Sequence, residues 1–106
     1  MRGTRSPGTV KNMGGMSTDE IARALEGFAG WAYDGDALIK TFTFDDFAAA
    51  IDFMAAARPR IDELNHHPEW TNVYNRVDVR LNSHDVGGIT DRDLKLARLL
   101  DELSAS

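Results

Sequence analysis

Residues 61–81, IDELNHHPEWTNVYNRVDVRL, contain the change of pattern that decides the fold. Before Pro68, apolar residues recur at the three- and four-residue spacing of a helix. After it, apolar and polar residues alternate, as in a strand with one buried face. Asn75-Arg76 is a candidate break that would divide this second part into two strands. The apolar set predicted to face the core is Val73, Val77, Val79 and Leu81.

The helix before this stretch is predicted to begin after Asp45, whose side chain can cap it. Pro59 lies inside it, lacks a backbone N–H and costs about 3 kcal/mol in a regular helix interior. We therefore expect a kink or break near Arg58, and a kinked helix is favoured because the apolar spacing continues on both sides. The predicted apolar face consists of Phe47, Ile51, Met54, Ile61 and Leu64.

Two further helices are predicted from capping boxes, in which a Ser or Thr is followed three residues later by an acid. Ser17 and Glu20 open the first, which Gly30 is expected to end, and Thr90 and Asp93 open the last. The apolar faces are Ile21, Leu25 and Phe28 in the first helix, and Leu96, Leu99, Leu100 and Leu103 in the last.

A β-hairpin is predicted between the first two helices. Asp34-Gly35 is a strong two-residue turn signal, and the run from Ala37 to Phe44 is typical of a strand. Lys40 interrupts its apolar face, which Leu38, Phe42 and Phe44 would form. The predicted order of elements favours an α+β two-layer sandwich with an antiparallel sheet covered by helices on one face.

The chain has 106 residues and a formal charge of -5, which the sequence distributes unevenly. Arg2, Arg5 and Lys11 give residues 1–15 a charge of +3 with no acids, which leaves -8 on residues 16–106. We expect residues 1–15 to be a disordered leader, or an over-long start preceding Met13 or Met16. Residues 16–106 are expected to form a single domain.

Composition argues against several classes of protein. An acidic body disfavours non-specific nucleic-acid binding, which depends on Lys and Arg. No run approaches the roughly 20 apolar residues of a membrane helix, and the basic N-terminus lacks the apolar segment of a secretory signal. There are no cysteines, so disulfides and thiol chemistry are excluded. A cytoplasmic location is the expectation that remains.

The three histidines are the candidate catalytic residues, because all three are predicted at the ends of elements. His66 and His67 lie where the second helix stops, and His84 follows the long strand. Imidazole exchanges protons near neutral pH. We hypothesise that the helix exit and the strand exit meet at one edge of the sheet. Trp70, next to the imidazoles in sequence, would suit a flat heterocycle.

Other interpretations of these residues are open at this point. Histidines before a proline are common at a plain helix terminus. The role of Asp93 could likewise be limited to capping the last helix. The histidines could also bind a metal with Asp62, Asp85 or Asp93. Their spacing matches no strong zinc pattern, however, and adjacent histidines rarely ligate one ion.

Three segments resemble the pterin-4a-carbinolamine dehydratases, also called dimerisation cofactors of a hepatocyte nuclear factor. They are DELNHHPEWTNVYN at 62–75, VDVRLNSH at 77–84 and GGITDRD at 87–93. Further similar positions lie upstream, and the resemblance extends from about Met16 to Leu103. It implies two strands, a helix, two strands and a helix after an extra N-terminal helix, which makes the sheet four-stranded. It also implies homodimers or homotetramers, often with sheets joined edge to edge.

The activity that the resemblance implies is loss of water from a 4a-hydroxytetrahydropterin, such as 4a-hydroxytetrahydrobiopterin, to give the quinonoid dihydropterin. This reaction regenerates the cofactor of aromatic amino-acid hydroxylases and needs no metal, nucleotide or redox cofactor. The alternative is a coactivator or dimerisation protein without essential catalysis. The implied catalytic residues are His66, His67, His84, Asp62 and Asp93. The expected pterin contacts are His66, His67, Pro68, Trp70, Ser83, His84, Asp85 and Val86.

Two positions depart from the family pattern. Pro59 lies in a helix that family members usually form without proline, which affects the geometry expected before Asp62. Asp62 itself stands where the family often has Glu, so its side chain is one methylene shorter and its reach to the site is expected to be weaker.

Overall fold

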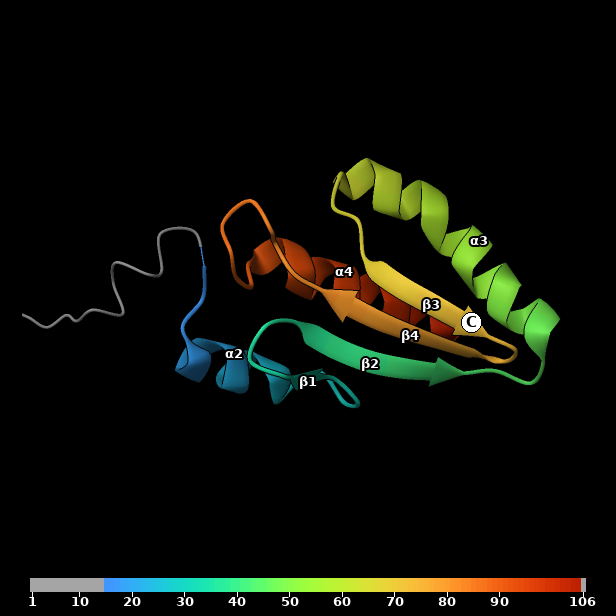
Figure 1. Cartoon of the computed structure of the whole chain (residues 1–106), viewed down its shortest axis with the longest axis horizontal. Helices are drawn as coiled ribbons and strands as arrows, with labels where there is room; N and C mark the ends of the chain where they lie inside the picture. Colours follow the sequence, from blue (N-terminus) through green and yellow to red (C-terminus); the bar gives the residue numbers. More distant parts are fainter. Residues whose placement is uncertain (1–14, 106) are drawn as a thin grey trace, which may run out of the picture.

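The computed structural model describes residues 15–105, and it confirms the predicted order of helices and strands. The predicted leader thus lies outside the described residues, except for Gly15. The elements, shown in Figure 1, are α2 (Thr18–Leu25), β1 (Ala32–Tyr33), β2 (Leu38–Thr43), α3 (Phe47–Leu64), β3 (Glu69–Val73), β4 (Arg76–Leu81) and α4 (Asp91–Ser104).

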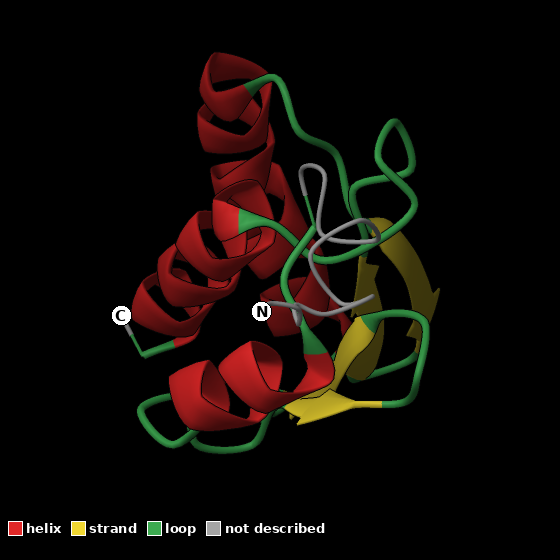
Figure 2. Ribbon diagram, turned by 90° about the vertical axis from the view of Figure 1, so that its left-hand side faces the viewer, coloured by secondary structure: helices red, strands yellow, loops and turns green. Residues whose placement is uncertain are grey.

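The four strands form one antiparallel sheet in the order β1-β2-β4-β3. Figure 2 shows the helices gathered on one side of this sheet, which leaves its other face open. The molecule is therefore the two-layer α+β sandwich that the pattern of elements predicts. Within residues 15–105, no helix combines the length and apolar character needed to cross a bilayer.

The turn between β3 and β4 corrects one predicted core residue. Val73 pairs with Arg76, so only Tyr74 and Asn75 separate the paired strands, and Tyr74 has a positive φ of 51°. A two-residue turn shifts the alternation, because paired residues point to the same side of the sheet. Val77 is fully buried, whereas Val73 is 50% exposed on the open face with Arg76. The single alternation drawn from Val73 through Val77 was wrong.

Helix α3 differs from the prediction in its cap and in its buried face. Asp46, not Asp45, is the N-cap, and its side chain accepts a hydrogen bond from Ala49 N at 2.8 Å. Phe47 and Ile51 are exposed, since the buried stripe uses small residues that allow close approach to the sheet. The stripe consists of Ala50, Phe53, Ala57 and Ile61. The helix runs unbroken through Pro59, so the favoured interpretation of one continuous helix holds and the alternative of a break near Arg58 is excluded. The kink itself stays a prediction.

Both capping boxes are confirmed, but the first helix is shorter than predicted. Ser17 and Glu20 exchange side-chain and backbone hydrogen bonds, and so do Thr90 and Asp93. Helix α2 ends at Leu25, and turns lead from there to Gly30, which has a φ of 88°. Lys40 meets Gly30 closely, since a Cβ on this glycine would lie 2.9 Å from Lys40 Cε.

The first hairpin has a four-residue loop instead of the predicted two-residue turn. Tyr33 pairs with Leu38, which leaves residues 34–37 between the strands. Asp34 Oδ1 accepts hydrogen bonds from the backbone of Asp36 at 2.9 Å and of Ala37 at 2.8 Å. The Asp side chain thus closes the loop by bonding to its own backbone two and three residues on.

Lys40 interrupts the apolar face of β2, as predicted, because its ammonium has partners on the helical side. Lys40 Nζ lies 2.7 Å from Asp101 Oδ1 in α4, and Trp31 Nε1 donates to the same carboxylate at 3.0 Å. Burying a polar group is tolerated when it is hydrogen-bonded. This contact therefore ties β2, α4 and the segment before β1 together.

Candidate active site

The loop after α3 and the loop after β4 meet at one end of the sheet. Helix α3 ends at Asn65, whose left-handed φ of 53° turns the chain, and His66 follows. His66 Nε2 lies 2.6 Å from Asp93 Oδ1 in the first turn of α4, and both side chains are buried. This contact joins the helix exit to α4, and Ser83, just after β4, donates to the same carboxylate. A direct meeting of His66 or His67 with His84 stays a prediction.

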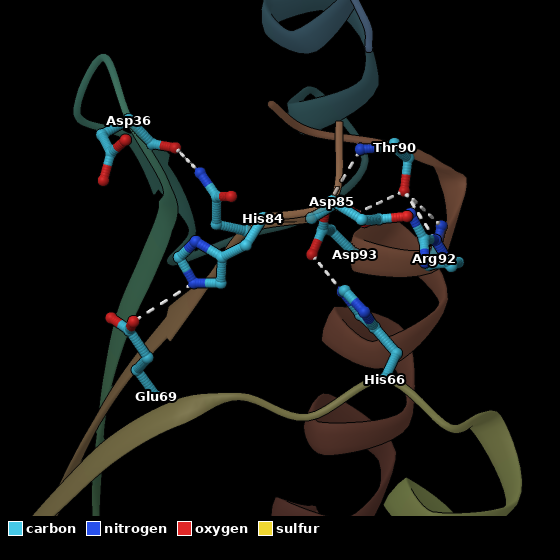
Figure 3. Close-up of polar contacts among 10 residues, drawn as sticks. Asp36, His66, Glu69, His84, Asp85, Thr90, Arg92 and Asp93 are labelled. Carbon is cyan, nitrogen blue, oxygen red and sulfur yellow. Dashed lines mark hydrogen bonds and ion pairs between the residues drawn. The ribbon is translucent and has the colours of Figure 1, made fainter. Parts of the chain in front are cut away.

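Asp93 organises the buried side of the site (Figure 3). Its Oδ2 accepts hydrogen bonds from Ser83 Oγ at 2.8 Å and from Thr90 N at 2.9 Å. Ser83 Oγ also lies 2.7 Å from Thr90 Oγ1. One carboxylate therefore caps α4, holds the end of the β4 segment and contacts His66. Asp93 can therefore cap α4 and contact His66 at the same time, so its interpretations as a helix cap and as a site residue are compatible.

His67 faces solvent and has a separate carboxylate partner. His67 Nε2 lies 3.2 Å from Asp62 Oδ1, while Arg58 donates to Asp62 Oδ2 at 2.9 Å. Asp62 lies on the last turn of α3, so the unbroken helix through Pro59 places it beside the loop. The short Asp side chain reaches its histidine in spite of the missing methylene.

His84 is exposed and pairs with Glu69, a residue with no predicted role in the site. His84 Nε2 lies 3.2 Å from Glu69 Oε2, as Figure 3 shows. Glu69 opens β3 and pairs in register with Arg80, near the end of β4. Reading Tyr74-Asn75 as a two-residue turn would have given this register, and with it the position of Glu69 beside the strand exit.

The other predicted contact residues lie around these histidines in different environments. Trp70 is half-buried and pairs with Val79, so its ring packs on the helical side of the sheet, opposite Glu69. Ser83 is fully buried and Pro68 is half-buried. The roles of these residues in binding a pterin stay predictions.

Residues 85–88 form the loop beyond His84. Asp85 is exposed and accepts two hydrogen bonds from Arg92 Nη2, at 2.8 and 3.0 Å. The Arg92 hydrogen bond holds the pKa of the Asp85 carboxyl below its ordinary value of 3.8. Val86 is half-buried, and its backbone N–H donates to Ser83 O at 3.0 Å. Their predicted contacts with a pterin stay predictions too.

All three histidines contact their carboxylates through the same ring nitrogen, Nε2. An ionised carboxylate only accepts hydrogen bonds, so a neutral imidazole in this contact carries its hydrogen on Nε2. The lone pair then lies on Nδ1, which can accept a proton from a ligand. The arrangement suits general acid–base chemistry on a bound molecule.

Other chemistry has less geometric support within the described part of the chain. No group of three or more His, Asp or Glu side chains in residues 15–105 is arranged to hold a metal ion. A groove of about 310 Å³ between α3 and α4 contains none of the histidines. Its lining residues are Arg60, Glu63, Leu64, Lys95, Arg98, Leu99 and Glu102.

Comparison with known proteins agrees with the geometry. The family model described as "Pterin 4 alpha carbinolamine dehydratase" matches residues 14–103. A protein of Rhizobium leguminosarum bv. trifolii, named "Putative pterin-4-alpha-carbinolamine dehydratase", is 49% identical over 97 residues, covering 85% of this chain and 96% of that protein. A protein of Metallosphaera sedula with the same name is 48% identical over 88 residues, covering 83% and 92%.

A solved structure is similar as well. The crystal structure of a "transcriptional coactivator/pterin dehydratase" from Brucella melitensis matches with a TM-score of 0.82 and 41% identity, covering 85% of this chain and 98% of that one. The residues that the family model matches include both loops of the site. On the family match and these relatives, the chain belongs to the pterin-4-alpha-carbinolamine dehydratase family.

Proposed function

We propose that the protein removes water from a 4a-hydroxytetrahydropterin, with 4a-hydroxytetrahydrobiopterin as the model substrate, and forms the quinonoid dihydropterin. The observation that carries this proposal is the set of three histidines, each within 3.2 Å of its own carboxylate. Membership of the family and the names of the relatives support dehydratase activity. The physiological role proposed is recycling of a tetrahydropterin cofactor in the cytoplasm, by a homodimer or homotetramer.

The reaction needs one proton donor and one proton acceptor. The C4a–O bond breaks as an imidazolium protonates the departing hydroxyl group, which leaves as water. A neutral imidazole removes the N–H proton from the adjacent ring nitrogen, and that electron pair forms the C=N bond. The proton taken up balances the proton given, so the site returns to its starting charge. A positioned acid–base pair typically accelerates such a step by about 10²–10⁴.

The three histidines are proposed to divide this work according to their surroundings. His67 and His84 are 60% and 70% exposed, so their rings can approach a substrate directly. His66 is buried against Asp93, a carboxylate fixed by two further donors. This carboxylate can stabilise an imidazolium at His66 and orient its ring. The partner-binding alternative has less support, because a scaffold would not require these paired histidines.

The test is to measure dehydration of a freshly generated 4a-hydroxytetrahydropterin by stopped-flow absorbance, with and without the purified full chain. EDTA is added to both reactions. We expect saturable acceleration that scales with protein concentration and persists in EDTA. A rate equal to that of the buffer control at all protein concentrations would contradict the proposal.

A further inference from the structure

We propose that Glu69 is a positioning residue for His84, and that Arg80 with the β1–β2 loop holds Glu69 in place. The inference rests on the proposed function only for its kinetic consequence. The contact between Glu69 and His84 involves the open face of the sheet and is separate from the buried pair of His66 with Asp93. It gives a function to the face that the helices leave uncovered.

The contact between Glu69 and His84 is close but exposed. Their side chains are 61% and 70% accessible, and the Oε2–Nε2 distance is 3.2 Å. An isolated exposed pair of this kind contributes little free energy to holding the two side chains together, since both lose conformational freedom on pairing and solvent screens the charges. A positioning role therefore requires that something else fix the carboxylate.

Arg80 provides that support, because it faces three carboxylates at once. Arg80 Nη1 donates to Asp34 Oδ2 at 2.6 Å, and Nη2 donates to Asp36 Oδ2 at 2.9 Å. Its Nε lies 3.7 Å from Glu69 Oε1. The planar guanidinium is thus oriented by two partners in the loop while its remaining edge faces Glu69. The two oxygens of Glu69 face different partners, Arg80 and His84.

The loop that orients Arg80 is itself constrained. Asp34 accepts two backbone hydrogen bonds of its own loop through Oδ1, which leaves Oδ2 for Arg80. The Ala37 backbone hydrogen bond, followed by the one from Arg80, lowers the pKa of Asp34 to about 2, so this carboxylate stays ionised near neutral pH. Asn82 Nδ2 also donates to the Asp36 carbonyl, which joins the loop to the segment leading to His84.

The chemical consequence concerns which nitrogen of His84 carries the hydrogen. Glu69 can only accept, so the pair favours the neutral tautomer with hydrogen on Nε2 and the lone pair on Nδ1. It also restricts rotation of an exposed ring that would otherwise sample several orientations. Both effects increase the fraction of His84 that is ready to exchange a proton with a bound pterin, and should therefore act on kcat more than on KM.

The experiment compares Glu69→Gln with Asp78→Asn. Asp78 is a matched control, since it is a carboxylate on the same open face, bonded to Thr41 and Arg76 and not to a histidine. Long-range ¹H–¹⁵N NMR on the ligand-free protein reports the His84 tautomer. We expect the Nε2–H form to dominate in the wild type and in Asp78→Asn, and both tautomers to appear in Glu69→Gln.

Kinetics give the second readout. We expect Glu69→Gln to lower kcat about fivefold with KM and the unfolding midpoint unchanged, as suits an exposed contact. The kcat of Glu69→Asp, which keeps the charge, should lie between the kcat of Glu69→Gln and that of the wild type. An unchanged tautomer and an unchanged kcat in Glu69→Gln would overturn the inference. A wild type without dehydratase activity would instead overturn the proposed function, while the NMR comparison would still test the positioning.

Discussion

Replacing Asp93 by alanine is expected to lower the free energy of unfolding by about 3–5 kcal/mol, the usual cost of removing one partner from a buried ionic network. Asp93 is fully buried, and its loss leaves His66 Nε2 and Thr90 N without their acceptor and removes one of the two hydrogen-bond partners of Ser83 Oγ. Polar groups stranded in the interior each carry a large desolvation penalty. Urea unfolding followed by tryptophan fluorescence measures the effect.

Asp91→Ala is the control for this experiment. Asp91 lies in the same first turn of α4, but its side chain is 76% exposed and forms an ion pair with Lys95 at 3.3 Å. Its removal should cost no more than about 1 kcal/mol through the exposed pair and the helix dipole. Equal unfolding free energies for the two variants would show that the Asp93 network contributes no more stability than the exposed pair of Asp91 with Lys95.

Replacing His84 by alanine is expected to lower kcat/KM for dehydration by about 10²–10⁴, the usual range for one general acid or base. The His84 side chain is 70% exposed, so the substitution creates no cavity and the fold should be retained. Stopped-flow kinetics on the variant measure the loss, and circular dichroism checks the fold.

Lys95→Ala gives the matched comparison for His84→Ala. Lys95 is exposed and lines the groove between α3 and α4, which contains no histidine. Its variant should keep wild-type kcat/KM. Full activity in His84→Ala would remove this histidine from the mechanism, and a large loss in Lys95→Ala would move the reaction toward the helical groove.

The sequence predicts the fold well where a local rule determines the structure. The capping boxes at Ser17 and Thr90 require only residues three apart, and the structure contains both. The change of period after Pro68 correctly separates α3 from the strands. His66 and His67 follow the end of α3 as predicted, because Asn65 adopts the left-handed conformation that ends a helix, and His84 follows the end of β4.

The failures arise where the answer depends on tertiary contacts or on the length of a turn. Simple alternation places Val73 in the core, but the two-residue turn after it puts Val73 on the opposite face of the sheet from Val77. Helical spacing predicts that Phe47 and Ile51 lie on the buried face of α3, yet both are exposed. Close packing of the helix on the sheet instead selects Ala50 and Ala57.

The candidate site was only partly predictable for the same reason. The pairing of Asp93 with His66 joins residues 27 positions apart, and no local spacing specifies it. Glu69 stood within the recognised motif, but its contact with His84 follows only from the register of β3 against β4. A carboxylate partner on a neighbouring strand can be predicted only when the register of the two strands is known.

The most direct test of the central claim is the crystal structure of the protein soaked with a dihydropterin. We expect the pterin ring to lie against His67 and His84, with at least two histidine Nδ1 atoms within about 2.6–3.2 Å of its polar atoms or of the hydroxyl position at C4a. A pterin bound in the groove between α3 and α4, with the histidines uncontacted, would contradict it.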